Sequence, residues 1–454
     1  MTLNGQISHW WHDLGGRPAA RESLRGRRDA DVCIVGAGYT GLWTAFYLKQ
    51  IQPTLDVVIV EREFAGYGAS GRNGGWLTAA LPGSARVLAR NGGPAAVTDL
   101  QVQLQEQVDE VIEVCAQHGI DADIVKGGEL RVATDTPQLQ RMRESWDPAD
   151  AADEQWLDAD QLAERVRIDG AQAAVWSPHC ARLHPAKLVR GLAELVEQQG
   201  VSILEGSVVE TIERGRVVTA HGEVHAPIVL RCTEGFTATI AGEHRTWLPM
   251  NSSMIVTAPL PDPVWDEIGW SGAEVIGDEA HVYMYAQRTA DDRIAIGGRG
   301  VPYRFGSRVD AAGATAPRTV DELSATLHRL WPATRGTAID HAWSGVLGVP
   351  RDWSATVTFD QATGAGFAGG YVGHGVVSSS LAGRTLADLS LGRETRHTAL
   401  PWVNRKVHKW EPEPLRWLGV RGLYAAYRFA DKRESGTGRT SRIARAADVI
   451  SRKP

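Results

Sequence analysis

The chain has 454 residues, of which 43% are hydrophobic and 22% are charged, and its formal net charge is −6 at pH 7. These values are typical of a globular protein of about two or three domains, and they exclude a disordered or collagen-like chain. The negative charge gives no reason to expect nucleic-acid binding. Because no segment is long and apolar enough to span a membrane and the N-terminus lacks an apolar signal core, we expect a cytoplasmic protein.

The cysteines and the C-terminal charges bear on metal sites and partners. Cys33, Cys115, Cys180 and Cys232 lie far apart and form no CxxC pair, so we expect no iron–sulfur cluster, no structural zinc and no other metal.

Residues 405–454 hold 13 Lys and Arg against 5 Asp and Glu. This basic tail either lies on the acidic remainder of the chain or meets a partner or a membrane surface.

One segment near the N-terminus follows the order of a βαβ dinucleotide-binding unit. A short apolar strand is followed at once by the motif Gly36-x-Gly38-x-x-Gly41, then by a helix-compatible stretch over 39–50, and then by a second apolar strand that ends at Glu61. A glycine-rich turn alone is common, but the turn, helix, strand and terminal acid together in register favour nucleotide binding over a purely structural βαβ turn.

Each part of this segment has a physical role in binding a nucleotide. Gly36 permits the tight turn, Gly38 lets the backbone approach a pyrophosphate, and Gly41 lets the helix pack closely on the strand. The helix N-terminus offers unpaired N–H groups to the phosphates. Glu61 is placed to accept hydrogen bonds from a ribose diol and would repel a 2′-phosphate, so FAD or NAD is favoured over NADP.

A second glycine-rich stretch, residues 66–76, follows the second strand directly. So many glycines disfavour a regular helix or strand, because ordering each one costs conformational entropy. The position suggests backbone that passes close to a flat or charged ligand, with Ser70, Arg72 and Asn73 supplying polar contacts. The alternative is a plain surface loop.

The apolar spacing predicts further elements along the chain. Helices are expected over 95–118 and 185–199, and strands over 201–213 and 216–232, the latter split by a turn at His221-Gly222. Its last part, 228–232, is apolar enough for a central parallel strand and delivers Thr233 to that strand's carboxyl end. Strand-like runs then follow from 247 to 342, which predicts a second, mixed α/β domain inserted into the first. A Thr319-x-x-Glu322 capping box is expected to open a helix there.

Two pairs of aromatic residues could either pack or bind a ligand. Trp10 and Trp11 are expected to pack an N-terminal arm onto the body. Tyr283 and Tyr285 alternate with other residues and would lie on one face of a strand, where they line a pocket or serve as ordinary sheet aromatics.

A third glycine turn, Gly373-His374-Gly375, is preceded by apolar sequence and opens a helix expected over 376–391. A helix N-terminus stabilises negative charge, such as that of a reduced flavin ring. His374 could face a ligand or cap the helix, and the sequence leaves both readings open.

Five motifs together give the chain a family resemblance. They are VGAGYTG with Glu61, GYGASGRNGGW, HPAKLVRGL, DRIAIGGRG and GGYVGHGVVSSSLAG. The chain thereby resembles the D-amino-acid-oxidase-type family of FAD-dependent oxidoreductases, which includes glycine and sarcosine oxidases, and most closely its gamma-glutamylputrescine oxidoreductase branch. The resemblance implies that FAD spans the parallel sheet with its isoalloxazine ring under an antiparallel sheet of the second domain.

The fold class predicted is therefore α/β, with a discontinuous Rossmann-like FAD-binding domain and an inserted α+β substrate domain that contains a mostly antiparallel sheet. The FAD-binding domain is expected over 1–90, 170–246 and 343–400, the substrate domain over 91–169 and 247–342, and a C-terminal wrap over 401–454.

Carried onto this sequence, the family pattern implies cofactor contacts from the residues of these motifs. They are Gly36, Ala37, Gly38, Tyr39, Thr40, Gly41, Glu61, Arg62, Ala69, Ser70, Arg72, Asn73, Gly74, Gly75, Val209, Thr233, Gly345, Gly373, His374, Gly375, Val376 and Val377.

The chain also departs from the family pattern. His184 stands where relatives often carry an aspartate, and Arg351-Asp352 lacks the proline that usually follows; both positions could lie near substrate. Relatives with covalent flavin use a late cysteine or a histidine in the second loop. This chain has no cysteine after Cys232 and reads Arg72-Asn73 in that loop, so we predict noncovalent FAD.

The function expected from the resemblance is oxidation of a C–N bond in an amine or amino acid. Hydride passes to the flavin and water hydrolyses the resulting imine, with Tyr285, Trp343 and His374 as the candidate residues around the substrate. The electron acceptor could be oxygen, or a quinone or carrier in a dehydrogenase. A nucleotide-binding protein without turnover is a further alternative. A NAD-only dehydrogenase is disfavoured because it would leave the second and third glycine loops without a role.

Overall fold

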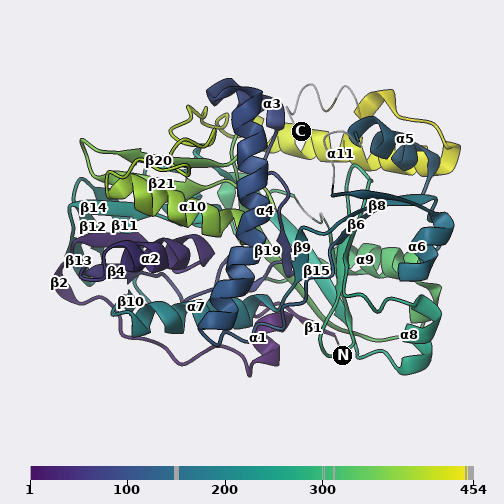
Figure 1. Cartoon of the computed structure of the whole chain (residues 1–454), viewed down its shortest axis with the longest axis horizontal. Coiled ribbons are helices and arrows are strands. Elements are labelled where there is room, and N and C mark those ends of the chain that lie inside the picture. Colours follow the sequence, from purple (N-terminus) through teal and green to yellow (C-terminus); the bar gives the residue numbers. More distant parts are fainter. Residues whose placement is uncertain are drawn as a thin grey trace.

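The structure, a computed structural model, describes residues 2–147, 153–298, 300, 302–309, 312–444 and 447. Arg299 of the DRIAIGGRG motif and part of the C-terminal wrap lie outside the described residues. The molecule has two lobes, each built on one large sheet, and the long helix α4 (Gly93–Gln117) stands between them (Figure 1). This helix matches the one expected over 95–118.

The first sheet has six strands in the order β10-β4-β3-β14-β21-β20. They are β10 (Ser202–Leu204), β4 (Val57–Val60), β3 (Val32–Val35), β14 (Ile228–Arg231), β21 (Ala365–Gly369) and β20 (Thr356–Asp360). All neighbouring pairs are parallel except β20 with β21. The central strands are almost continuously apolar because both faces of a parallel sheet are covered.

Alternation along β3 sends its side chains to two different cores. Val32 and Ile34 join the main core, and Cys33 and Val35 pack on the opposite face. The main core is closed by three helices, α2 (Tyr39–Ile51), α7 (Pro185–Gln198) and α10 (Gly375–Ser390). The opposite face is closed by a four-stranded sheet of β11 (Val209–Glu213), β12 (Arg216–Thr219), β13 (Gly222–His225) and β2 (Gly26–Asp29).

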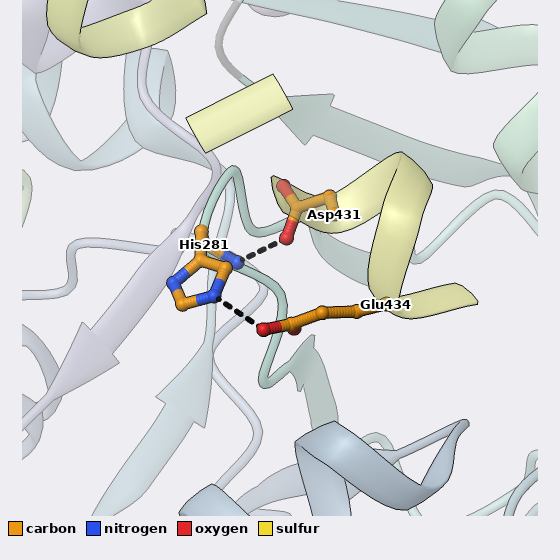
Figure 2. A group of neighbouring side chains, drawn as sticks. All are labelled: His281, Asp431 and Glu434. Atoms are coloured by element: carbon orange, nitrogen blue, oxygen red, sulfur yellow. Dashed lines mark hydrogen bonds and ion pairs between the residues drawn. The ribbon is translucent and has the colours of Figure 1, made fainter. Parts of the chain in front are cut away.

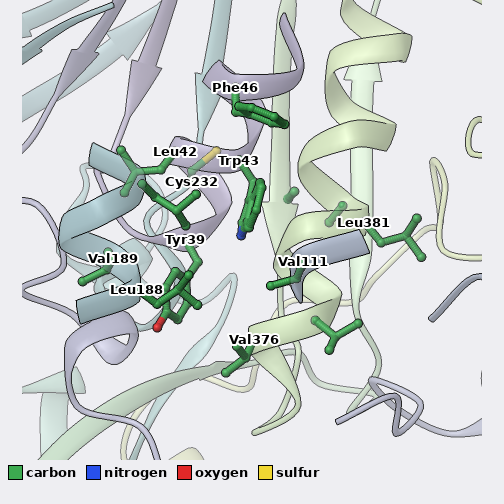
Figure 3. Close-up of a cluster of buried hydrophobic side chains, with 14 of the residues drawn as sticks. Tyr39, Leu42, Trp43, Phe46, Val111, Leu188, Val189, Cys232, Val376 and Leu381 are labelled. Carbon is green, nitrogen blue, oxygen red and sulfur yellow. The ribbon is translucent and has the colours of Figure 1, made fainter. Parts of the chain in front are cut away.

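Helix α2 lies at the centre of the main core and is buried on nearly all sides (Figure 3). Leu42 and Trp43 are fully buried, and Leu188 of α7 and Leu381 of α10 belong to the same cluster. A helix that is apolar all round is typical of such a buried position. The packing fixes the N-terminus of α2 relative to the strand that precedes it.

The second sheet has nine strands in the order β1-β19-β15-β18-β17-β16-β6-β8-β7. They are β1 (Leu3–Asn4), β19 (Ile339–Val349), β15 (Leu248–Thr257), β18 (Ile294–Gly298), β17 (Tyr285–Arg288), β16 (Val275–Asp278), β6 (Glu129–Ala133), β8 (Ala173–Ser177) and β7 (Gln155–Asp158). Six of its eight pairings are antiparallel, and β1 with β19 and β16 with β6 are parallel. The predicted fold class is thus confirmed.

Shorter elements complete the structure. The remaining helices are α1 (His9–Asp13), α3 (Ala85–Leu88), α5 (Thr136–Ser145), α6 (Ala159–Arg165), α8 (Asp262–Ile268), α9 (Pro317–Leu330) and α11 (Leu415–Thr437). Strands β5 (Trp76–Thr78) and β9 (Cys180–Arg182) pair with each other, and the 3₁₀ turns include η1 (Ala69–Gly71) and η3 (Glu234–Thr239). No helix within the described residues is long and apolar enough to cross a membrane.

Three expected local features are wrong. The strand expected over 201–213 is divided into β10 and β11, which lie in different sheets. Helix α9 begins at Pro317 after Ala316 and has no side-chain cap, so Thr319 lies inside the helix and forms no capping box. Proline at the first position supplies the start instead, because its fixed φ suits a helix and its missing N–H needs no partner there. Strand β17 begins only at Tyr285, so Tyr283 lies in the turn before the strand.

Strand pairing crosses the domain boundaries expected from the sequence. β19 runs through residue 343 and pairs along its length with β15, and β8 lies in the second sheet although residue 170 was expected to begin a return to the first. Each lobe therefore takes strands from several distant parts of the chain.

Candidate functional site

The first glycine turn is tightly packed, as the sequence requires. Gly36 has φ +106°, and a Cβ there would lie 2.6 Å from the carbonyl oxygen of Cys232. A Cβ at Gly41 would lie 2.0 Å from the carbonyl oxygen of Gly36. Only glycine permits this close approach of β3, the turn and α2. The turn thus holds the N-terminus of α2 against the carboxyl end of the sheet.

The space in front of this turn is a cavity at the carboxyl ends of β3, β4 and β14, which we call the nucleotide cleft. Gly38 lies on its wall, and a Cβ there would meet only the Ser70 Oγ, at 3.0 Å. The Ser70 hydroxyl accepts a hydrogen bond from the Tyr39 backbone N–H at 2.8 Å. The second glycine-rich stretch therefore joins the first at the helix N-terminus, where backbone N–H groups favour phosphate.

Glu61 lies on the wall of the cleft at the end of β4. Its Oε2 accepts a hydrogen bond from the Ala37 N–H at 2.8 Å, and its Oε1 accepts one from the Glu63 N–H at 2.9 Å. Burial raises the pKa of this carboxyl to about 7. A carboxylate oxygen retains further lone pairs, so both Glu61 oxygens can still accept hydrogen bonds from a ligand in the cleft.

The far end of the cleft is formed by the third glycine turn. Gly373 has φ +112° and lies on the wall beside the N-terminus of α10. The carboxylate of Glu234 accepts hydrogen bonds from the N–H groups of Gly370 and Tyr371, each at 3.3 Å, and burial raises its pKa to about 7. Glu234 thus fixes this turn from η3, which follows the central strand β14.

A second cavity, which we call the chamber, adjoins the cleft. Both cavities share Ala69, Asn73, Leu347, Gly373 and Val376 on their walls. The chamber lies under the antiparallel sheet and is also lined by Trp76, Thr78, Ser252, Tyr283, Tyr285 and His374. The cleft and the chamber therefore adjoin each other at these shared wall residues.

Tyr285 is closely packed in the chamber wall. Its hydroxyl lies 2.8 Å from the Ser252 Oγ. A Cβ at Gly74 would lie 2.8 Å from its ring, and a Cβ at Gly297 would lie 2.3 Å from it. Glycine on both sides thus leaves room for the aromatic ring. Tyr285 lies on the chamber wall, as the pocket reading requires, and is also packed as a sheet aromatic.

Three distant elements hold consecutive carbonyls of the second glycine-rich stretch. The indole N–H of Trp343 donates to the Arg72 carbonyl at 2.9 Å, and that of Trp10 donates to the Asn73 carbonyl at 2.8 Å. The Gln287 amide donates to the Gly74 carbonyl at 2.7 Å. These bonds fix the loop where it passes from cleft to chamber.

Most predicted cofactor residues lie on the cavity walls. The cleft wall holds Gly36, Gly38, Tyr39, Thr40, Glu61, Arg62, Ala69, Ser70, Asn73, Val209, Thr233, Gly373, Gly375 and Val376. The chamber adds Arg72, Gly74, Gly345 and His374 together with Tyr285. His374 is the N-cap residue of α10 and also lies on the chamber wall, so the structure is compatible with both readings.

Five predicted residues lie on neither wall: Ala37, Gly41, Gly75, Val377 and Trp343. Trp343 is fully buried and reaches the site only through its bond to the loop carbonyl, so we assign it a supporting role rather than substrate contact. A Cβ at Gly75 would lie 2.0 Å from the Gln287 amide nitrogen, so this glycine serves packing behind the loop.

The sequence reading missed several wall residues. Glu234 and Phe236 in the cleft and Ser252 in the chamber belong to no glycine motif. The position of Glu234, directly after a central strand and Thr233, was the available signal, because ligands bind at the carboxyl ends of such strands. Ser252 gave none, since only strand pairing brings it to the chamber.

The two departures from the family pattern do not lie on the chamber wall. His184 caps α7 by accepting a hydrogen bond from the Lys187 N–H at Nδ1, and its Nε2 lies 3.3 Å from Asp13. Asp352 pairs with Arg405 at 2.9 Å and fixes the C-terminal segment. Both positions are therefore occupied with structural contacts.

Comparison with known proteins agrees with this geometry. The family model described as "FAD dependent oxidoreductase" (DAO) matches residues 31–389. The chain is 29% identical over 407 residues to gamma-glutamylputrescine oxidoreductase of Escherichia coli K12, covering 87% of this chain and 92% of that protein.

Solved structures with the same fold include two enzymes at lower identity. Glycine oxidase from Geobacillus kaustophilus has a TM-score of 0.67 at 22% identity, covering 81% of this chain and 96% of its own. L-proline dehydrogenase from P. horikoshii has a TM-score of 0.65 at 18% identity, covering 83% and 98%. With the family match spanning most of the chain and the cleft shaped for a dinucleotide, the resemblance is confirmed. The chain belongs to the DAO family of FAD-dependent oxidoreductases, and its cofactor is FAD.

Proposed function

We propose that the protein oxidises the C–N bond of an amine or amino acid, with FAD as the hydride acceptor. The observation that carries the proposal is the junction of the nucleotide cleft with the chamber. FAD held along the cleft would present its reactive end at the shared wall, where Gly373 and Asn73 border both spaces. A substrate in the chamber would then meet the cofactor away from the bulk solvent.

The residues of the chamber suit a reaction in which the cofactor supplies the chemistry. When bound, FAD accepts two electrons as a hydride from the carbon next to the amine nitrogen. The substrate loses that hydride and a proton to become an imine, and water hydrolyses the imine to a carbonyl and an amine or ammonia. The described lining residues of the chamber include no Asp or Glu, so orientation and exclusion of water are the contributions expected from the protein.

The substrate class is inferred from the relatives. The E. coli K12 protein is named gamma-glutamylputrescine oxidoreductase, and the structural neighbours include a glycine oxidase. Tyr283, Tyr285 and Trp76 would pack against the carbon chain of such a substrate. We therefore expect an N-acylated diamine, a simple amine or a small amino acid to be oxidised.

We also propose a division of labour between the lobes. The segments 1–90, 170–246 and 343–400 chiefly build the lobe that holds FAD, while 91–169 and 247–342 chiefly cover the substrate. Strands β8 and β19 are exceptions to this division, because they pair in the second sheet although residues 173–177 and 343–349 lie in the segments assigned to the FAD lobe.

FAD is proposed to be bound noncovalently. Cys232 is the cysteine on the cleft wall; it is buried beside the first glycine turn, and burial raises its pKa to about 12, which disfavours a reactive thiolate. Acid precipitation of the purified protein is expected to leave the yellow colour in the supernatant. Colour carried down with the protein would contradict this assignment.

The proposed function is tested by the visible spectrum of the purified holoenzyme under anaerobic conditions. Pools of diamines, N-acylated diamines and amino acids are added in turn, and bleaching of the flavin bands by one pool is expected. Flavin bands that persist with every pool would overturn amine oxidation. Peroxide yield after readmission of air then separates an oxidase from a dehydrogenase that uses a quinone or carrier.

A further inference from the structure

The C-terminal helix α11 carries two acids that contact the turn between β16 and β17. His281 in that turn and Asp431 and Glu434 on α11 each offer a metal-type ligand atom, and these atoms lie within 4.8 Å of one another (Figure 2). The arrangement could be taken for a metal site, so its hydrogen bonds decide what it does.

The cluster of His281, Asp431 and Glu434 already contacts a cation, the Arg141 side chain. The Arg141 guanidinium from α5 donates to the Glu434 Oε2 at 2.6 Å and lies 3.2 Å from the His281 Nε2. The other Glu434 oxygen lies 3.3 Å from His281 and accepts a hydrogen bond from the Ser441 N–H at 2.7 Å. A metal ion would have to displace the Arg141–Glu434 ion pair and the backbone hydrogen bonds of Asp431, so we assign no metal here.

Asp431 contacts the backbone of the turn. Its Oδ1 accepts a hydrogen bond from the His281 N–H and its Oδ2 accepts one from the Val282 N–H, both at 2.9 Å. Figure 2 shows the Asp431 carboxylate directed at the His281 backbone nitrogen. One carboxylate thus fixes two consecutive peptide units through charge-assisted hydrogen bonds.

The residue after this contact is Tyr283, which lines the chamber. Its hydroxyl would lie 3.5 Å from a Cβ at Gly373, the turn shared by both cavities, and its ring centroid lies 6.3 Å from that of Tyr285. On the other side of the turn, the Asp278 Oδ1 accepts a hydrogen bond from the Met284 N–H at 2.9 Å. Two carboxylates therefore hold the backbone on both sides of Tyr283.

We propose that Asp431 and Glu434 of α11, with Arg141, are positioning residues that hold the β16–β17 turn and place Tyr283 against the substrate. The C-terminal wrap is thereby part of the substrate site although none of α11 lines the chamber. The inference deepens the proposed function and rests on it for the role of the chamber.

The first test is hydrogen exchange in the unmodified holoenzyme, which needs no substrate and no variant. The peptide that carries His281 and Val282 is expected to exchange slowly, because both N–H groups donate to Asp431. Rapid exchange of these two amides would overturn the proposal, whatever the protein oxidises.

The second test compares D431N with the unmodified enzyme by anaerobic flavin reduction. The amide of asparagine offers one acceptor oxygen and turns a donor toward the other N–H, so one charge-assisted hydrogen bond is lost. The dissociation constant of the amine substrate is expected to rise about tenfold, the effect of losing one such bond, while FAD content and the limiting rate of reduction stay within about twofold. D321N, an exposed aspartate on α9, is the matched control and is expected to change nothing.

A double-mutant cycle shows whether Asp431 acts through Tyr283. In a Tyr283→Ala background D431N should weaken substrate binding no further, because the positioned ring is already absent. Additive effects of the two changes would contradict the inference that Asp431 acts through Tyr283. Unchanged substrate binding in D431N alone would contradict it as well. If no amine reduces the unmodified enzyme, the proposed function fails, and the hydrogen-exchange result still decides whether the turn is held.

Discussion

Two glycines of the first turn serve different purposes. Alanine at Gly41 should affect the stability of the fold, and alanine at Gly38 should affect FAD binding. A Cβ at Gly41 would lie 2.0 Å from the Gly36 carbonyl oxygen, more than an ångström inside an ordinary contact of roughly 3.5 Å. Because the obstacle is backbone of a buried turn, relief requires β3 or α2 to shift. We expect Gly41→Ala to cost about 3 kcal/mol of unfolding free energy, the upper end of the range for overpacked cores.

Gly38→Ala should leave the fold nearly intact. The new methyl group would meet only the Ser70 hydroxyl, at 3.0 Å, and a small shift of that side chain relieves the contact while weakening its hydrogen bond from the Tyr39 N–H. The loss of unfolding free energy should therefore stay below about 1 kcal/mol. The methyl group would instead enter the cleft where the pyrophosphate is expected, and we expect the FAD dissociation constant to rise by about tenfold or more.

Both variants are compared as FAD-free proteins, by urea unfolding and by titration with FAD. Gly422→Ala on α11 is the control, because no atom lies within 4 Å of its Cβ position; it should gain about 0.5–1 kcal/mol and bind FAD normally. Unaltered FAD affinity in Gly38→Ala would refute the inferred path of the pyrophosphate. Unaltered stability in Gly41→Ala would refute the packing argument.

Two further predictions concern the acid of the cleft and the tyrosine of the chamber. Burial raises the pKa of Glu61 from its ordinary value of 4.5 to about 7 in the FAD-free protein, so ionising it opposes folding. The unfolding free energy of the unmodified protein minus that of Glu61→Gln should fall as the pH rises from 4.5 to about 7 and then level off; a flat difference in urea unfolding would contradict this. Tyr285→Phe loses the hydroxyl contact to Ser252 and should raise the KM of the amine about tenfold with FAD content unchanged, and unaltered kinetics would remove Tyr285 from the site.

The local chemistry of the cofactor site could be predicted from the sequence, because it depends on residues that are close together in the chain. The turn at Gly36, the helix after it and Glu61 lie within one βαβ unit, where spacing alone determines which groups reach the same edge of the sheet. The helix expected over 95–118 could also be predicted, since apolar residues at helical spacing identify one buried face.

The start of α9 and the extent of β17 could not be predicted correctly from the sequence. Thr319 and Glu322 have the spacing of a capping box, but Pro317 begins the helix earlier. Alternation through Tyr283 and Tyr285 suggested one strand, yet Asp431 binds the backbone N–H groups just before Tyr283 and holds them out of the ladder. For β17 a contact from a remote residue overrides the local preference, whereas for α9 one local signal, the proline, overrides another.

By itself, the sequence determined the dinucleotide turn, the three glycine-rich loops and the family, because these are encoded by short-range spacing of residues with special backbone freedom. Only the tertiary structure decided that Trp10, Gln287 and Trp343 hold the second loop, that Trp343 supports the site from behind, and that α11 holds the turn over the chamber. These contacts join residues more than 60 positions apart, and such pairings arise from how sheets and helices pack, which no local pattern specifies.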